Sequence, residues 1–142
     1  RAPAAGQRHE RVGQLRHARL ALMHRGDALP LVKEDVELHE AILEMTAKRL
    51  GAIFVVDDNG KLCGIVTDGD IRRAFQRGTD TLQIRTSAIM GAHPKRVTKD
   101  MIALDALRLM EDDQITILVV VDDDDKPVGA LHIHDLVRAG IG

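Results

Sequence analysis

Gly64-Ile65-Val66-Thr67-Asp68-Gly69-Asp70 decides the fold of this 142-residue chain, because a second version of it follows 65 residues later. The second version is Gly129-Ala130-Leu131-His132-Ile133-His134-Asp135. Each has a short apolar run, then a threonine or histidine, then an aspartate three residues further on. The pattern predicts a strand that turns tightly into a helix, with helices over residues 71–76 and 136–139 that end at Gly78 and Gly140.

The correspondence extends along most of the chain without a gap. An offset of 65 pairs Val32 with Val97, Asp35 with Asp100, Met45 with Met110, Val55 with Val120, Lys61 with Lys126 and Arg73 with Arg138. We interpret the chain as an internal duplication, in which each unit has the order strand–helix–strand–strand–helix. The prediction is an α+β fold: a linker or expression remnant over residues 1–22, and units over 23–86 and 87–142. Since one unit buries little apolar surface, the two should pack around a pseudo-twofold axis with two related clefts between them.

The pattern also places the individual elements. Strands are expected over residues 53–56, 62–66, 96–98, 117–121 and 128–131, where β-branched residues are frequent. Asp35 and Asp100 are plausible N-caps of the first helix in each unit, and Gly51 should close the first of these helices. Asn59-Gly60 predicts a two-residue hairpin turn, because such a turn needs positive φ.

Composition excludes several classes of protein. The net charge is −2, and the absence of Trp and Tyr, with two Phe, removes the stacking surfaces of single-strand binders. No apolar run approaches the roughly 18 residues of a membrane helix. The single cysteine, Cys63, fits a reducing compartment and is most simply a small buried hydrophobe. We therefore expect a soluble, cytoplasmic protein that binds neither nucleic acid nor membrane, although the five arginines in residues 1–19 are compatible either with contact to an anionic partner or with a solvated tail.

Catalytic motifs are missing from the sequence. Ser87 is the only serine and lies in no nucleophile turn, and no glycine-rich phosphate loop of the Walker type is present. The acidic pairs, such as Asp57-Asp58, are turn residues first. We therefore assign no catalytic residue.

The repeat resembles the cystathionine-β-synthase (CBS) domain pair, a regulatory module that senses adenosine compounds and other nucleotides. The likeness covers about residues 23–142, and the Gly64, Thr67 and Asp70 spacing is its most specific element. The resemblance implies that Asp70 and Asp135 accept hydrogen bonds from ribose hydroxyls, with phosphate near Thr67 and the helix N-terminus. From the residues alone, both aspartates are equally well explained as helix N-caps. The remaining expected ligand-binding residues are Gly51, Ile53, Thr116, Ile117 and His132, and the strand residues among them are as well explained as core.

His132 stands where the first unit has threonine. A protonated imidazole would favour phosphate, which predicts binding that improves at mildly acid pH, whereas a strand-end histidine bonded to backbone is the plainer interpretation. His132 and His134 could also turn toward a metal with Asp135 or His93. Two ligands do not close a zinc site, so we assign no metal.

Three stretches narrow the resemblance to bacterial D-arabinose-5-phosphate isomerases of the KpsF/GutQ family: residues 23–27, 67–75 and 131–140. Those enzymes carry a sugar-isomerase (SIS) domain in front of a CBS pair, and no SIS domain is present here, so isomerase activity is not expected in this chain. The resemblance implies a module that binds AMP, ATP or a CMP-Kdo type nucleotide, requires no cofactor, and adjusts a parent isomerase of the Kdo and lipopolysaccharide pathway. The alternative is a structural module that pairs as a homodimer and has no physiological ligand.

Overall fold

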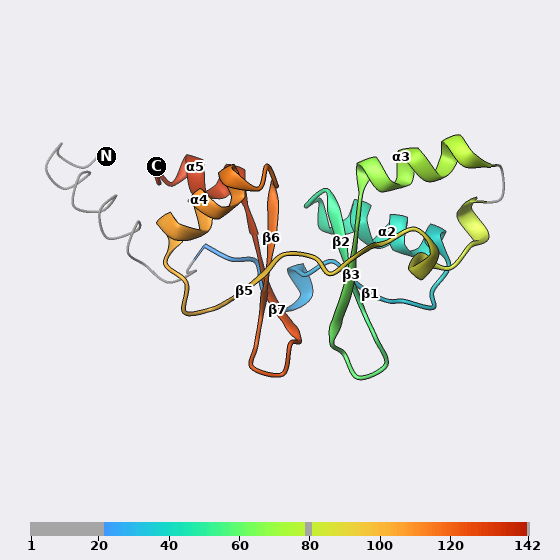
Figure 1. The fold of residues 1–142 in the computed structure, drawn as a ribbon, viewed down its shortest axis with the longest axis horizontal. Coiled ribbons are helices and arrows are strands. Elements are labelled where there is room, and N and C mark those ends of the chain that lie inside the picture. Colours follow the sequence, from blue (N-terminus) through green and yellow to red (C-terminus); the bar gives the residue numbers. More distant parts are fainter. Residues whose placement is uncertain (1–21, 79–80, 142) are drawn as a thin grey trace, which may run out of the picture.

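The two copies of the repeat form two separate β-sheets in the computed structural model, which describes residues 22–78 and 81–141 (Figure 1). The first sheet has the order β1-β2-β3-β4 and the second the order β5-β6-β7. The strands are β1 (Leu31–Lys33), β2 (Ala52–Val56), β3 (Leu62–Thr67), β4 (Gly91–Ala92), β5 (Arg96–Thr98), β6 (Ile117–Val121) and β7 (Pro127–His132). The mixed α+β class and the duplication are both confirmed.

The two sheets repeat each other in register. In each, a parallel pair is followed by an antiparallel hairpin, and Ala52 lies opposite Thr67 as Ile117 lies opposite His132. Both hairpins carry an irregularity at the same place, between Val55 and Val56 and between Val120 and Val121. An offset of 65 therefore describes the backbone as well as the sequence.

The hairpin turn of the first repeat differs from the expected two-residue turn. The Gly60 N–H donates to the carbonyl of Asp57 at 3.0 Å, and the Asp57 carboxylate accepts the N–H groups of Asn59 and Lys61. Gly60 has positive φ and Asn59 does not, so the prediction of a two-residue Asn-Gly turn is wrong. The turn begins at Asp57, one residue earlier, and the Asp57 carboxylate stabilises it.

Four α-helices lie within the described residues: α2 (Leu38–Lys48), α3 (Asp68–Arg77), α4 (Ala103–Asp112) and α5 (Ile133–Arg138). Short 3₁₀ turns occupy Gly26–Ala28, Thr81–Gln83 and Thr86–Ala88. None of these helices has the length and apolar character to cross a membrane. The predicted linker over residues 1–22 lies almost wholly outside the described residues.

The ends of α2 and α4 correct two predictions. Glu37 and Ile102 are the N-caps, rather than Asp35 and Asp100, and neither makes a side-chain capping bond. The Leu38 N–H is instead satisfied by the carbonyl of Ile84 at 2.8 Å. At its other end α2 closes on Arg49, at φ 61°, two residues before the expected Gly51.

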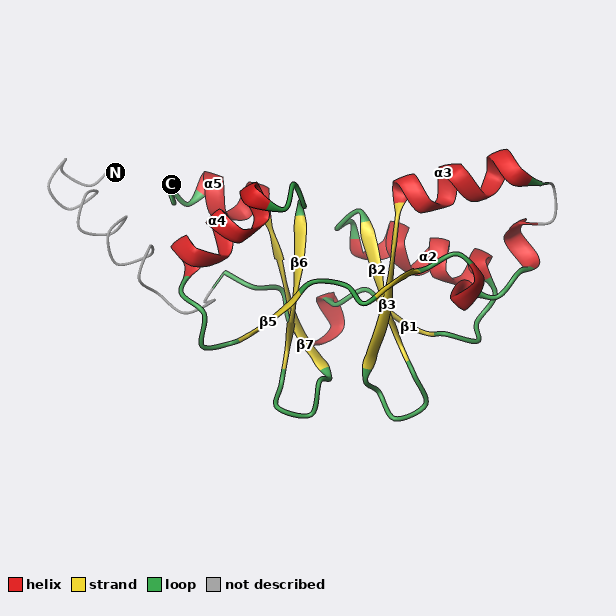
Figure 2. Cartoon of the chain, in the orientation of Figure 1, coloured by secondary structure: helices red, strands yellow, loops and turns green. Residues whose placement is uncertain are grey.

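The helices lie on the outer side of each sheet, and the two sheets face each other (Figure 2). Alternate strand residues divide between these two sides. On β2, Ile53 and Val55 pack toward the helices, whereas Phe54 belongs to a central cluster that also holds Val119 and Ala130 of the second repeat. This shared cluster joins the two repeats into one unit.

Each repeat also lends a segment to the sheet of the other. His24 exchanges two backbone hydrogen bonds with Ala130 of β7, of 2.8 and 3.0 Å, and β4 pairs with β3. The methionine before each segment covers a glycine of the opposite strand: Met23 lies over Gly129, and Met90 over Gly64. We call residues 23–24 and 90–92 the exchanged arms.

A polar contact joins the repeats beside the hairpin turns. The Asp125 carbonyl accepts the N–H of Leu62 at 3.0 Å, and Nη1 of Arg96 lies 2.7 and 2.6 Å from the two carboxylate oxygens of Asp125. The same Nη1 lies 3.4 Å from the Leu62 carbonyl. Asp125 has φ 63° at the position that Gly60 occupies in the first repeat, and its bonds to Arg96 and Leu62 offset the cost of that backbone conformation.

Candidate functional site

Thr67 and Asp70 form a reciprocal cap at the start of α3. The Asp70 N–H donates to Oγ1 of Thr67 at 3.4 Å, and Oδ2 of Asp70 accepts the Thr67 N–H at 2.9 Å. The N-cap is therefore Thr67, and the prediction that Asp70 itself is the N-cap is wrong. Asp70 stands one turn inside the helix, where it reaches back to the cap. Arg73 donates to its other oxygen, Oδ1, at 2.6 Å.

The second copy of this motif makes different hydrogen bonds. His132 is the N-cap of α5, and its Nδ1 accepts the N–H of His134 at 3.2 Å. Asp135, which the sequence predicts as the cap, accepts hydrogen bonds from two other side chains. Nε2 of His24 donates to Oδ2 at 2.7 Å, and Arg138 donates to Oδ1 at 2.6 Å. The N-terminal exchanged arm therefore reaches the motif aspartate of the second repeat.

The surroundings shift the pKa of two of these groups. Burial opposes the charged form of Asp135, but the hydrogen bonds from His24 and Arg138 outweigh it and lower the pKa of the carboxyl. Burial, and then the charge of His134, lower the pKa of His132. The fold therefore favours the neutral ring of His132, so protonation would need a pH below the usual histidine range, and the predicted gain in binding at acid pH stays a prediction. Since Nδ1 accepts a hydrogen bond, that neutral ring carries its proton on Nε2.

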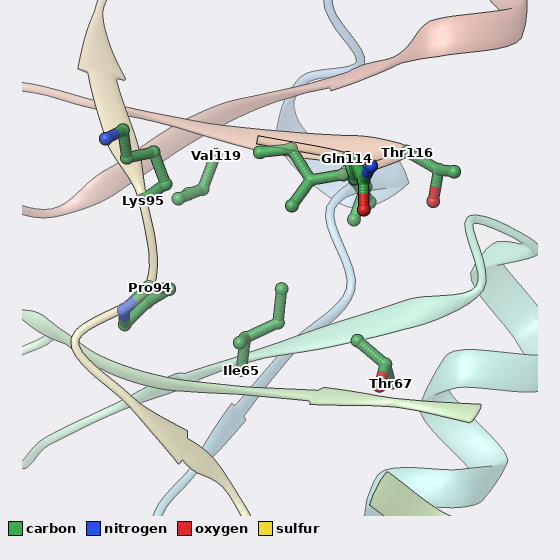
Figure 3. A pocket seen from close by; sticks show the side chains of 9 residues that line it. Ile65, Thr67, Pro94, Lys95, Gln114, Thr116 and Val119 are labelled. Carbon is green, nitrogen blue, oxygen red and sulfur yellow. The ribbon is translucent and has the colours of Figure 1, made fainter. Parts of the chain in front are cut away.

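One cleft lies between the end of β3 and the second repeat, with a volume of about 360 Å³ (Figure 3). We call it the Thr67 cleft. Ile65 and Thr67 form one wall, Thr116 and its neighbours the facing wall, and Pro94 and Lys95 one end. The full lining is Ile65, Thr67, Pro94, Lys95, Gln114, Ile115, Thr116, Ile117 and Val119. Its surface is mostly aliphatic.

A second cleft, of about 430 Å³, lies at the related position in the other half of the molecule. We call it the His132 cleft. Its lining is His24, Lys48, Arg49, Leu50, His132, His134, Asp135 and Arg138. The offset of 65 relates His132 to Thr67, Arg49 to Gln114 and Leu50 to Ile115. The prediction of two related clefts between the repeats is confirmed.

The structure distributes the predicted site residues between the two clefts. Thr116 and Ile117 line the Thr67 cleft, and Asp70 stands beside it through its cap with Thr67. His132 and Asp135 line the His132 cleft, to which Gly51 is adjacent in the chain through Leu50. Each cleft therefore combines the motif of one repeat with the helix-to-strand connection of the other.

Ile53 is misplaced by the sequence prediction. Its side chain is fully buried on the helix side of the first sheet and lines neither cleft. The residue related to Ile117 by the offset of 65 is Ala52, so the prediction slipped by one position. In a strand, a slip of one residue places the side chain on the opposite face.

Sequence reasoning also missed several cleft residues. Arg49 and Gln114 both have positive φ, of 61° and 56°, at equivalent positions after a helix. The signal available in the sequence was that Arg49 and Gln114 occupy equivalent positions in the two repeats. His24 carried no such signal, because its contact with Asp135 spans 111 residues.

The remaining candidates can be placed briefly. The rings of His132 and His134 meet edge to face with centroids 4.8 Å apart, but residues 22–78 and 81–141 hold no group of three metal-ligating side chains. Cys63 lies 3.3 Å from Oε2 of Glu34, and burial, with this neighbour, raises the pKa of its thiol to about 11.

Comparison with known proteins identifies both repeats. Residues 19–77 and 87–142 match the CBS domain. Over 120 residues the chain is 51% identical to arabinose 5-phosphate isomerase KdsD of Pseudomonas aeruginosa and 44% identical to that of Escherichia coli K12. These matches cover 84% of this chain but only 37% and 36% of the two enzymes. The chain therefore spans about a third of the length of these curated relatives.

Solved structures share the same architecture. A crystal structure of CBSX2 in complex with AMP superposes with a TM-score of 0.70 at 29% identity, covering 83% of this chain and 91% of that one. A CBS domain pair in complex with 5′-methylthioadenosine and S-adenosyl-L-methionine gives a TM-score of 0.74 at 21% identity, covering 85% and 97%. At 21% identity, the second match supports the fold alone.

Proposed function

This chain belongs to the CBS domain family, and we propose that it is a regulatory module that binds a nucleotide or nucleotide-sugar between its two repeats. The observation that carries the proposal is the pair of clefts related by the internal repeat, one lined by Asp135 and the other by Thr67, whose N–H donates to Asp70. The complex of CBSX2 with AMP supports this class of ligand. We assign the chain no catalytic role.

The chemistry of the clefts suits a nucleoside. Oδ1 of Asp70 accepts one hydrogen bond, from Arg73, so that oxygen retains acceptor capacity for a ribose hydroxyl. Asp135 has the same capacity on each oxygen. In the Thr67 cleft the base would lie between the aliphatic side chains of Ile65 and Ile117, beside the hydroxyls of Thr67 and Thr116.

The relatives suggest the setting in which this module works. We propose that the parent protein is a cytoplasmic D-arabinose-5-phosphate isomerase, in which this pair adjusts an SIS catalytic domain. Because that enzyme class supplies the pathway to Kdo, CMP-Kdo is a logical feedback ligand beside AMP and ATP.

Thermal denaturation of this chain tests the proposal, with AMP, ATP, CMP, CMP-Kdo and arabinose 5-phosphate as probes. A ligand at 100 times its Kd adds about 2.7 kcal/mol and raises the Tm by several degrees. Asp70→Asn should abolish the rise in Tm caused by a ligand of the Thr67 cleft, and Asp135→Asn the rise caused by a ligand of the His132 cleft. Asp58→Asn, at an exposed position of the hairpin turn, should retain the rise in Tm. No shift with any probe would refute nucleotide sensing.

Assembly is a second candidate function, favoured by apolar side chains exposed on the helices. Leu43 of α2, Phe75 of α3 and Val137 of α5 are 68%, 48% and 59% exposed. We propose a second copy of this pair as their partner, so that the module joins parent subunits. Sedimentation of the chain should then show a dimer that Phe75→Glu or Val137→Glu dissociates. A monomer at all concentrations up to about 0.1 mM, well above the micromolar range of specific association, would refute it.

A further inference from the structure

The two clefts differ in charge although the repeat relates them. Among the described residues, Lys95 is the only charged side chain that lines the Thr67 cleft, and its Nζ lies 3.3 Å from Oδ2 of Asp113. The cationic side chains Lys48, Arg49 and Arg138 line the His132 cleft, against the single carboxylate of Asp135. The His132 cleft also holds three histidine rings, those of His24, His132 and His134.

The difference in charge arises where Lys48 corresponds to Asp113, which reverses the charge, and Arg49 corresponds to Gln114. The three histidines of the His132 cleft, His24, His132 and His134, correspond to Ile89, Thr67 and Gly69. Arg73 and Arg138, by contrast, both bind their motif aspartate at 2.6 Å. The excess of positive charge therefore belongs to the helix-to-strand connection after α2.

Arg49 is the cation with the fewest competing contacts. Its side chain is exposed and has no ion-pair partner within residues 22–78 and 81–141. Lys48 is shared with Glu44, 3.6 Å away, and with the carbonyl of Asp27, while Arg138 is held by Asp135. A guanidinium in this position suits a phosphate, which accepts two of its N–H donors at once.

The other groups of the cleft tolerate an anion. The negative charge of Asp135 is compensated by hydrogen bonds from His24 and Arg138. The neutral ring of His132 uses Nδ1 as an acceptor, which leaves its Nε2–H as a further donor to a ligand oxygen. Neither histidine needs to gain a proton for the cleft to attract a phosphate.

We propose that the His132 cleft is selective for phosphorylated ligands through Arg49, whereas the Thr67 cleft does not discriminate by charge. This inference rests on the proposed nucleotide-binding function and assigns its two clefts different ligand classes. The His132 cleft then takes a nucleoside monophosphate or nucleotide-sugar, whereas the Thr67 cleft takes an uncharged nucleoside as readily as its monophosphate.

Calorimetric titration of this chain with two matched pairs, adenosine and AMP, and cytidine and CMP, tests the inference. The His132 cleft should bind the monophosphate at least tenfold more tightly than its nucleoside. Arg49→Gln installs the residue that the Thr67 cleft carries and should remove about tenfold of this preference while leaving the nucleoside Kd unchanged. Raising NaCl from 50 to 300 mM should weaken the same preference, because the contact is ionic.

The reciprocal variant, Gln114→Arg, is the matched control and should create a phosphate preference in the Thr67 cleft. An unchanged ratio of nucleoside to monophosphate affinity in Arg49→Gln, with an unchanged Tm, overturns the inference and leaves the proposed function standing. Absence of binding by all four probes overturns the proposed function, and this inference with it.

Discussion

Replacing Gly64 by alanine tests the exchanged arms directly. A Cβ at this position would lie 2.8 Å from Cγ and 3.1 Å from Cβ of Met90, and closer still to its sulfur. Real side chains do not approach so closely, so Met90 must move and strain the pairing of β4 with β3. A Cβ at Gly129 would likewise crowd Met23, at 3.1 Å from its Cγ and 3.2 Å from its Cε.

Two opposing effects set the magnitude. Overpacking of a well-packed site costs about 1–3 kcal/mol. Replacing glycine also reduces the conformational freedom of the unfolded chain, which stabilises the folded state by about 0.4–1 kcal/mol. We expect a net destabilisation of about 1–2 kcal/mol, which for a domain of this size lowers the Tm by about 3–6 °C.

Chemical and thermal unfolding of Gly64→Ala measure the effect. Gly78→Ala is the matched control, since its added Cβ would meet nothing within 4 Å at an extended backbone. The double variant Gly64→Ala with Met90→Ala should be less destabilised than the two single effects added together, because the clash is then gone. An unchanged Tm in Gly64→Ala, or strict additivity in the double variant, would refute the packing argument.

Four further predictions concern single side chains. Thr67→Ala should lower the free energy of unfolding by about 1 kcal/mol through loss of the cap of α3, and Thr67→Ser should restore it in urea titrations. Arg96→Met should cost about 1 kcal/mol, because it leaves the Asp125 carboxylate without its partner between the repeats, and high salt should narrow the difference from wild type in the same titrations. The Cys63 thiol, with a pKa of about 11, should resist iodoacetamide at pH 7.5 in the folded chain and react rapidly in urea; rapid labelling of the native protein would contradict this. Because folding lowers the pKa of Asp135, the ionised carboxylate should contribute fully to stability above its ordinary pKa of 3.8, and this contribution should disappear as the pH falls through the lower folded value. Urea unfolding between pH 2.5 and 6 should show this loss in the wild type and not in Asp135→Asn.

The repeat made most of the fold predictable. Because a strand at 117–121 and one at 53–56 stand at the same offset as the motifs, each half supported the assignment of the other, and β6 begins and ends where expected. The errors lie at the ends of helices and at the first hairpin turn. Threonine and aspartate both cap well, so the pair Thr67 and Asp70 leaves the choice of cap open until the backbone is seen.

The clefts were harder to predict than the elements around them. Their positions follow from the pseudo-twofold symmetry, but each is built from residues far apart in the sequence, such as Thr67 with Thr116 and His24 with Asp135. No local pattern states which connection faces which motif. The error at Ile53 has the same origin, since the face of a strand depends on a register that a single mismatched position reverses.

The exchanged arms have a consequence for the order in which the chain folds during synthesis. In the first sheet, β3 can pair with its last neighbour only after residues 91–92 have been synthesised. The segment at His24 is made early, but it can pair only after Ala130 has been synthesised. The first half is therefore incomplete when the ribosome finishes it, whereas the second half pairs with a segment that has already been made. Such distant pairings slow folding, and they make the two repeats a single cooperative unit that ends its assembly only after the last strand has emerged.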